Sequence, residues 1–221
     1  MSKNNLLNEL DDLWTDDMIA TKVEEDITNY ERKIGKKIGF PIYPDEIASV
    51  LWEINTEYPD HVYDESGNDV FGRFDSAKKI IQVSTFMRIN DGQVSFTTAH
   101  EVGHASMHDF MSSISCGNQD TKRSIKKIEQ QAEKYASIIL MPRNLTHEAV
   151  SMLVGRGLPV DLEVVSPKLM SLLKVSRQAL EIRLGNLGYQ LMNSRYGVSY
   201  ERSHEKLFLE IEEERQSKRM V

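Results

Sequence analysis

The sequence predicts an α+β fold that is mostly helical, with a small antiparallel sheet and a C-terminal helical segment. Apolar residues recur at three- and four-residue spacing through most of the chain, which is typical of amphipathic helices. Residues 70–74 and 79–84 are instead typical of two short strands joined by a turn at Asp75 and Ser76. The 221 residues are enough for one domain with a sizeable core and appended helices.

Three helices are expected before the strands. The apolar stripes of the first two are Leu6, Leu7, Leu10, Leu13 and Trp14, followed by Ile19, Val23, Ile27, Tyr30 and Ile34. The third begins at Pro44, because proline is favoured in the first turn of a helix. We expect the first helix to be an N-terminal extension that packs on the domain.

Another helix is predicted after the strands. Its apolar stripe comprises Phe96, Ala99, Gly103, Met107 and Phe110. Upstream, Asn90, Asp91 and Gly92 supply turn and capping chemistry. His100 and His104 lie beside this stripe, where imidazole nitrogens need hydrogen-bond partners or a metal ion.

His100, Glu101 and His104 form the pattern H-E-x-x-H. Residues four apart on a helix lie one turn above each other, so the two imidazoles can bind the same metal ion. Glu101 is then beside the metal but not bound to it. Such a carboxylate can take a proton from an attacking water molecule and pass it to the leaving amine of a peptide bond. The pattern therefore indicates a metallopeptidase.

A catalytic zinc ion usually has three protein ligands, so one more is needed. His108 is too far along the same helix, because eight residues of helix rise about 12 Å; we expect it beside the site or in the core. A second helix, which Pro142 terminates, carries Glu129 and Glu133 one turn apart, and either can reach the imidazoles from an antiparallel helix. The apolar stripe of this second helix is Ile128, Ala132, Tyr135, Ala136 and Ile139.

The C-terminal part is expected to be helical as well. Residues 145–154 form one helix, while Ser166 with Pro167, and Ser176, are N-caps of two more. Those two resemble a helix-turn-helix in outline, but they lack a basic face, so we expect a structural or partner-docking unit. Residues 200–221 are dominated by Glu, Lys and Arg and are expected to be an exposed helix or disordered.

Composition narrows the function classes. The net charge of −7 makes direct nucleic-acid binding unlikely and favours a basic partner protein, because phosphate binding depends on clustered Lys and Arg. The single cysteine, Cys116, excludes an internal disulfide and indicates a reducing compartment. There is no apolar run as long as a membrane span and no hydrophobic region of a signal peptide, so a cytoplasmic location is expected.

Two segments together resemble the ImmA/IrrE family of metallopeptidases. The first is His100-Glu101-Val102-Gly103-His104, and the second is Glu129-x-x-Ala132-x-x-Tyr135-Ala136-x-x-Ile139-Leu140-Met141-Pro142. The similarity extends more weakly over residues 25–190. It departs from the family pattern at Glu133, where the family commonly has asparagine, and at Tyr135, where it has phenylalanine.

The resemblance implies a zincin-like metallopeptidase domain in which Glu129 is the third ligand. Zn²⁺ would then be bound by His100, His104 and Glu129, with Glu101 as the catalytic acid and base; Mn²⁺ or Fe²⁺ can bind the same donors. Four regions are expected: an N-terminal helical extension (1–24), the peptidase domain (25–160), a C-terminal helical subdomain (161–199) and a charged tail (200–221).

The resemblance also implies a function. Family members inactivate helix-turn-helix repressors by cleavage, so we expect a zinc-dependent endopeptidase that hydrolyses a peptide bond in such a repressor and derepresses stress or mobile-element genes. The alternative is a non-proteolytic antirepressor, in which zinc is structural and the chain sequesters the repressor. Repressor inactivation that persists after Glu101→Gln would favour the alternative.

Overall fold

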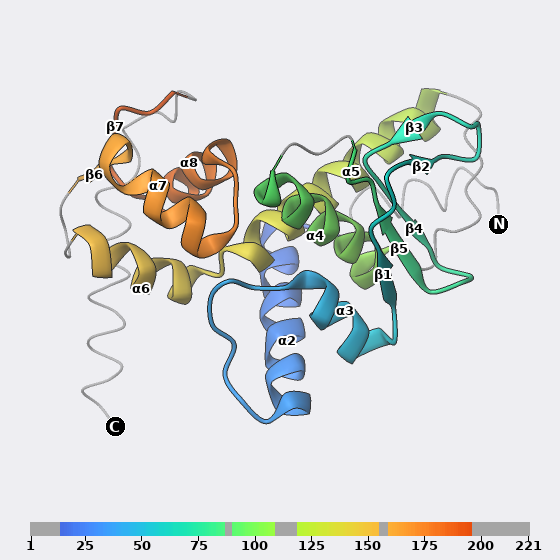
Figure 1. Cartoon of the computed structure of the whole chain (residues 1–221), viewed down its shortest axis with the longest axis horizontal. Coiled ribbons are helices and arrows are strands. Elements are labelled where there is room, and N and C mark those ends of the chain that lie inside the picture. Colours follow the sequence, from blue (N-terminus) through green and yellow to red (C-terminus); the bar gives the residue numbers. More distant parts are fainter. Residues whose placement is uncertain (1–13, 87–89, 109–118, 155–158, 196–221) are drawn as a thin grey trace. The chain divides into compact units, whose positions relative to one another are not determined.

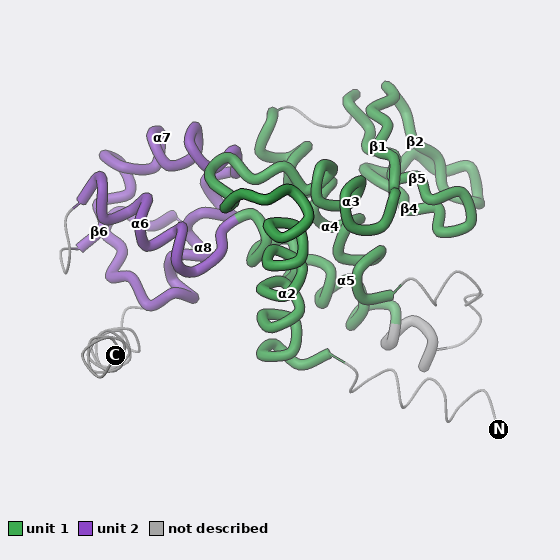
Figure 2. The backbone as a smooth tube through the Cα atoms, turned by 90° about the horizontal axis from the view of Figure 1, so that it is seen from below, with its two compact units in different colours: residues 1–140 green, residues 141–221 purple. Residues whose placement is uncertain are grey.

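The computed structural model describes residues 14–86, 90–108, 119–154 and 159–195 (Figure 1). The chain divides into two compact units, residues 1–140 and 141–221 (Figure 2). The mostly helical α+β class is confirmed. The expected helix around Leu6, the cysteine Cys116 and the charged tail lie outside the described residues. Among the described helices, none is both long and apolar enough to cross a lipid bilayer.

Helix α2 (Asp16–Ile34) is the first described element of unit 1. Its N-terminus is capped by Thr15, whose hydroxyl accepts a hydrogen bond from the Met18 N–H at 3.3 Å. Of the five residues of the predicted stripe, Ile19, Val23 and Tyr30 are buried and Ile27 and Ile34 are half-buried. Asp26, which is not part of the predicted apolar stripe, is also buried on this face.

Helix α3 (Pro44–Trp52) begins at Pro44, as predicted. It buries Ile47 and Ala48 completely. The Tyr30 hydroxyl donates a hydrogen bond of 3.1 Å to Glu46 and thereby joins α2 to α3.

A three-stranded sheet follows, with the strand order β1-β5-β4. Strands β4 (Gly72–Asp75) and β5 (Ile80–Val83) are the predicted antiparallel pair, with Phe74 opposite Ile81. Strand β1 (Asn55–Glu57) was not predicted; it runs parallel to β5, so the sheet is mixed. A separate two-stranded ladder joins β2 (Val62–Tyr63) to β3 (Asp69–Val70). Strand β4 is therefore an edge of the three-stranded sheet.

Helices α4 (Asp91–Met107) and α5 (Gln119–Leu140) lie alongside each other, and α4 also packs against β4 and β5 (Figure 1). The Asn90 side chain accepts a hydrogen bond of 3.0 Å from the Gln93 N–H, so the predicted cap of α4 is confirmed. Helix α5 ends two residues before Pro142, as predicted, and its whole apolar stripe is buried.

Unit 2 contains α6 (Arg143–Val154), α7 (Leu162–Leu173) and α8 (Arg177–Asn186), with β6 (Val160–Asp161) parallel to β7 (Leu191–Met192). The predicted cap Ser176 is confirmed, since its hydroxyl accepts from the Ala179 N–H at 3.2 Å. The expectation that Ser166 and Pro167 begin a helix was wrong. Helix α7 begins one turn earlier, because the Asp161 carboxylate caps it by accepting from the Glu163 N–H at 3.0 Å.

Candidate metal centre

Helix α4 presents His100 and His104 one turn apart on the same side. Their Nε2 atoms are 3.0 Å apart, and the two rings meet edge to face at an angle of 78°. Both side chains are mostly buried, with 16% and 18% of their surfaces exposed. The two imidazoles therefore direct the same kind of nitrogen toward one point, as the H-E-x-x-H spacing predicts.

Helix α5 brings a carboxylate to the same point. Glu129 Oε2 lies 3.1 Å from His100 Nε2, and Glu129 Oε1 lies 3.4 Å from His104 Nε2. These three residues form a group that can hold a metal ion, with one donor atom from each within 4.8 Å of the others. Glu133, the other carboxylate that the spacing allowed, is exposed and is not part of this group.

The donor set fits a zinc ion in both chemistry and spacing. Two imidazole nitrogens and one carboxylate oxygen are a common ligand set of catalytic zinc. A tetrahedral zinc ion with bonds of about 2.0–2.1 Å keeps its ligand atoms about 3.3 Å apart. His100 Nε2 lies 3.0 Å from His104 Nε2 and 3.1 Å from Glu129 Oε2, and one donor atom of each residue lies within 4.8 Å of the others, so an ion fits between them after a small movement of Glu129.

A close helix contact explains why Glu129 reaches the imidazoles. A methyl group added at Gly103 would lie 3.2 Å from two carbons of Tyr135 and 3.3 Å from the Ala132 Cα, so α4 approaches α5 at a residue without a side chain. Glu129 lies three residues before Ala132 and shares its side of α5. The small residues Gly103 and Ala132 therefore set the distance between the two halves of the ligand group.

Glu101 lies beside the ligand group but faces the sheet. It is 7% exposed, and the nearby main chain of Phe74 in β4 favours its charged form. Burial raises the pKa of Glu101 above its usual value, although His104 and His100 favour its charged form. A carboxylate with a raised pKa is a stronger base and is suited to moving protons near neutral pH.

Strand β4 fits tightly against Glu101 because of Gly72. A methyl group at Gly72 would lie 2.6 Å from Thr97 Cγ2 and 2.8 Å from Glu101 Oε1. Both distances are shorter than van der Waals contact, so only glycine allows this approach. Gly72 is thus a residue of the site that the sequence analysis did not identify as such.

The charges of the ligand group depend on each other. Burial alone would lower the pKa of His100, but the hydrogen bond to Glu129 and the charges of Glu101, Glu129 and Glu133 raise it overall. The hydrogen bond from His100 and the nearby imidazole of His104 hold the pKa of Glu129 well below its usual range, so this carboxylate is ionised. An ionised carboxylate next to two imidazoles supplies the negative charge that a divalent cation needs.

His108 lies at the end of α4, as a neighbour of the ligand group and not a member of it. It is 6% exposed, and its Nδ1 lies 3.3 Å from His104 Nδ1. Burial lowers the pKa of His108 to about 4, which keeps the ring neutral. Its other nitrogen bonds Gln131 of α5 at 3.0 Å, a residue that the sequence analysis did not consider.

Comparison with known proteins identifies a family and a solved structure with a similar fold. Residues 64–185, more than half of the chain, match the peptidase family described as the IrrE N-terminal-like domain. No curated protein sequence matches the chain. Among solved structures, a Mycobacterium tuberculosis transcriptional regulator is similar, with a TM-score of 0.51 and 16% identity. The match covers 75% of this chain and 46% of that one, and at this identity it shows a shared fold only.

Proposed function

This chain belongs to the peptidase family described as the IrrE N-terminal-like domain, and on that basis we propose that it is a zinc-dependent endopeptidase. One observation carries the proposal. Donor atoms of His100, His104 and Glu129 lie within 4.8 Å of one another, and the buried carboxylate of Glu101 lies beside them. A structural zinc site has four protein ligands and needs no base, whereas three ligands next to a buried carboxylate suit catalysis.

The chemistry divides between the ion and the protein. Zinc bound by these three residues supplies a Lewis acid that polarises a peptide carbonyl and lowers the pKa of a water molecule. Glu101 removes a proton from the attacking water and delivers it to the leaving amine. The close approach of Gly72 in β4 holds the Glu101 carboxylate in place during both transfers.

We further propose that the substrate binds to β4 as an additional strand. Strand β4 lies at the edge of the sheet, and α4 packs against it. An extended peptide on this edge gains main-chain hydrogen bonds and lies next to Glu101. A proline scan across β4 that leaves both the fold and cleavage unchanged would rule out this mode of binding.

The proposed substrate is a helix-turn-helix transcriptional repressor in the cytoplasm, whose cleavage would derepress stress or mobile-element genes. The family resemblance suggests this class of substrate. The net charge of −7 supports it, because a repressor that binds DNA carries basic surfaces that an acidic protein attracts.

Comparison of newly formed protein N-termini tests the proposed function. Zinc-loaded wild type and the Glu101→Gln variant are each added to a lysate of the source cells, and new N-termini are identified by mass spectrometry. We expect a few new termini within a helix-turn-helix protein for wild type, and none for the variant or after metal removal with a chelator. Repressor inactivation by Glu101→Gln without new termini would favour the antirepressor alternative.

A further inference from the structure

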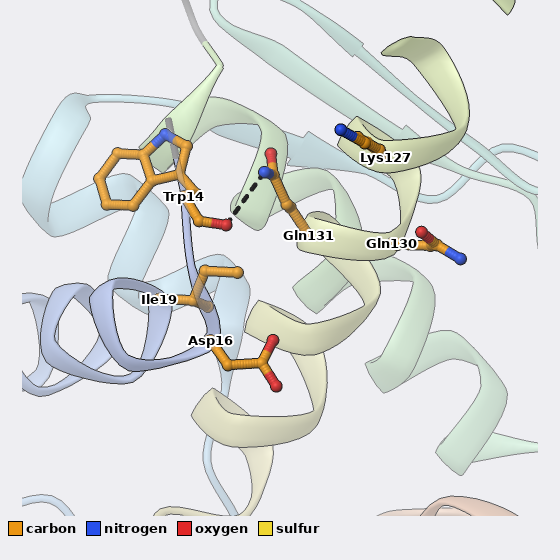
Figure 3. A pocket seen from close by; sticks show the side chains of 6 residues that line it. All are labelled: Trp14, Asp16, Ile19, Lys127, Gln130 and Gln131. Atoms are coloured by element: carbon orange, nitrogen blue, oxygen red, sulfur yellow. Dashed lines mark hydrogen bonds between the residues drawn. The ribbon is translucent and has the colours of Figure 1, made fainter. Parts of the chain in front are cut away.

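A line of hydrogen-bonding groups leads away from the ligand group on the side opposite the proposed metal. His104 Nδ1 lies 3.3 Å from His108 Nδ1, and His108 Nε2 lies 3.0 Å from Gln131 Oε1. Gln131 Nε2 donates in turn to the main-chain oxygen of Trp14 at 3.1 Å (Figure 3). His108 and Gln131 are only 6% and 9% exposed, so little water reaches these bonds.

The chemistry of the last acceptor fixes the direction of every bond in this line. A main-chain carbonyl oxygen only accepts, so the Gln131 amide nitrogen must face Trp14 and the Gln131 amide oxygen must face His108. That oxygen also only accepts, so the proton of a neutral His108 must be on Nε2. His108 Nδ1 is then unprotonated and accepts from His104 Nδ1–H, so a neutral His104 carries no proton on Nε2.

We propose that Gln131 is a positioning residue that, through His108, holds His104 in the tautomer that binds metal through Nε2. The inference rests on the proposed metal site but adds to it a residue outside the H-E-x-x-H pattern. His104 Nε2 is the nitrogen that faces His100 and Glu129, so this is the tautomer that the ligand group requires. Ligand histidines generally depend on such a partner at the other ring nitrogen for orientation and basicity.

The line connects three elements that are distant in sequence. His104 and His108 belong to α4, Gln131 belongs to α5, and Trp14 precedes α2. Gln131, Trp14 and Gln130 line an open pocket of about 210 Å³. Figure 3 shows these side chains and the hydrogen bond between Gln131 and Trp14. Gln130 is exposed, so a matched substitution one residue away from Gln131 leaves the line intact.

Zinc affinity measured by competition with a chelator tests the inference. Gln131→Met keeps the size of the side chain but removes the acceptor, and we expect it to weaken zinc binding about tenfold or more. Gln130→Met should bind zinc as wild type does. A double variant with His108→Leu should bind no more weakly than His108→Leu alone, because both changes interrupt one path.

Several results would overturn the inference. If wild type binds zinc and Gln131→Met binds it equally well, the positioning role is wrong while the proposed function stands. Additive losses in the double variant also contradict a single path. If wild type binds no zinc, the proposed function and the positioning role fail together.

A second measurement needs no variant and so does not depend on whether Gln131→Met folds. Nitrogen-15 NMR of zinc-loaded wild type distinguishes the two tautomers of each histidine. We expect His108 to carry its proton on Nε2. A proton on His108 Nδ1 would contradict the proposed direction of the line.

Discussion

Strand β4, at the edge of the sheet, determines where the carboxylate of Glu101 lies. The missing side chain of Gly72 lets β4 approach the Glu101 carboxylate, and the nearby main chain of Phe74 favours its charged form. Burial raises the pKa of Glu101, so its contact with β4 affects both its position and its basicity. Substitutions in β4 are therefore expected to affect catalysis through Glu101.

Gly72→Ala tests this contact. The added methyl would lie 2.6 Å from Thr97 Cγ2 and 2.8 Å from Glu101 Oε1, so the strand or the carboxylate must move. We expect kcat/KM for cleavage to fall about 10- to 100-fold with zinc content unchanged. Gly39→Ala is the control, because a methyl group there meets no atom within 4 Å. Equal activity of the two variants would contradict the role of Gly72.

His108 makes the stability of the metal-free protein depend on pH. Its folded-state pKa, about 4, is below the unfolded value of about 6.5, so the unfolded state binds the extra proton first as pH falls. The stability that the neutral ring contributes is fully present above about pH 6.5 and is lost as pH falls toward 4. Between pH 8 and pH 5 the loss is about 2 kcal/mol.

Denaturant unfolding of the metal-free protein at pH 8 and at pH 5 measures this loss. The comparison is between wild type and His108→Leu, because the other titrating groups are common to both. Between pH 8 and pH 5, we expect the free energy of unfolding of His108→Leu to fall by about 2 kcal/mol less than that of wild type. The same pH dependence in both proteins would show that His108 is not buried in its neutral form.

At the scale of the elements, the distance between α4 and α5 decides whether the ligand group forms. Gly103 faces Ala132 and Tyr135 at the closest approach of the two helices. Behind this contact, Asp26 of α2 accepts hydrogen bonds from Ser106 of α4 at 2.7 Å and from Tyr135 of α5 at 2.8 Å. One buried carboxylate thus joins three helices, and Tyr135 is a residue at which this chain departs from the family pattern.

Gly103→Ala and Gly103→Val test the helix distance with side chains of increasing size. Alanine needs a shift of a few tenths of an ångström at contacts of 3.2–3.3 Å, and valine needs more. We expect zinc affinity to fall about tenfold for alanine and further for valine, because Glu129 moves away from the imidazoles. Unchanged affinity in the valine variant would mean that this contact does not control the ligand geometry.

Tyr135→Phe tests the link through Asp26. The loss of a buried hydrogen bond to a charged group should lower the free energy of unfolding by about 2 kcal/mol, with zinc binding preserved. Tyr30→Phe removes a similar bond to Glu46, which is exposed, so the cost should be below about 1 kcal/mol. Equal losses in the two variants would contradict a special role for the buried carboxylate.

At the scale of the whole molecule, the sequence predicts features that depend on local spacing. The apolar stripe of α5, the caps at Asn90 and Ser176, and the β4–β5 pair follow from short-range patterns, and the structure has them. His100 and His104 converge for the same reason, since one turn of helix separates them. These features need no knowledge of what packs against the chain.

Features that depend on distant partners were not predictable in the same way. Spacing could not choose between Glu129 and Glu133, because the choice depends on which side of α5 meets Gly103. Strand β1 is stabilised by β5, a later strand, and Gln131 matters only because Trp14 and His108 lie beside it. The burial of Asp26, by contrast, was predictable, because Asp26 continues the helical spacing of Ile19, Val23 and Tyr30.

Zinc content of the purified protein, measured by mass spectrometry without added metal, shows whether His100, His104 and Glu129 bind a zinc ion. The comparison includes wild type, His100→Ala, Glu129→Ala and the control Glu133→Ala, which removes a neighbouring exposed carboxylate. We expect about one zinc ion per chain in wild type and in Glu133→Ala, and loss of the metal in the other two variants. The proposed zinc site would be wrong if zinc stays bound in Glu129→Ala. It would also be wrong if wild type contains no zinc and binds none when zinc is added.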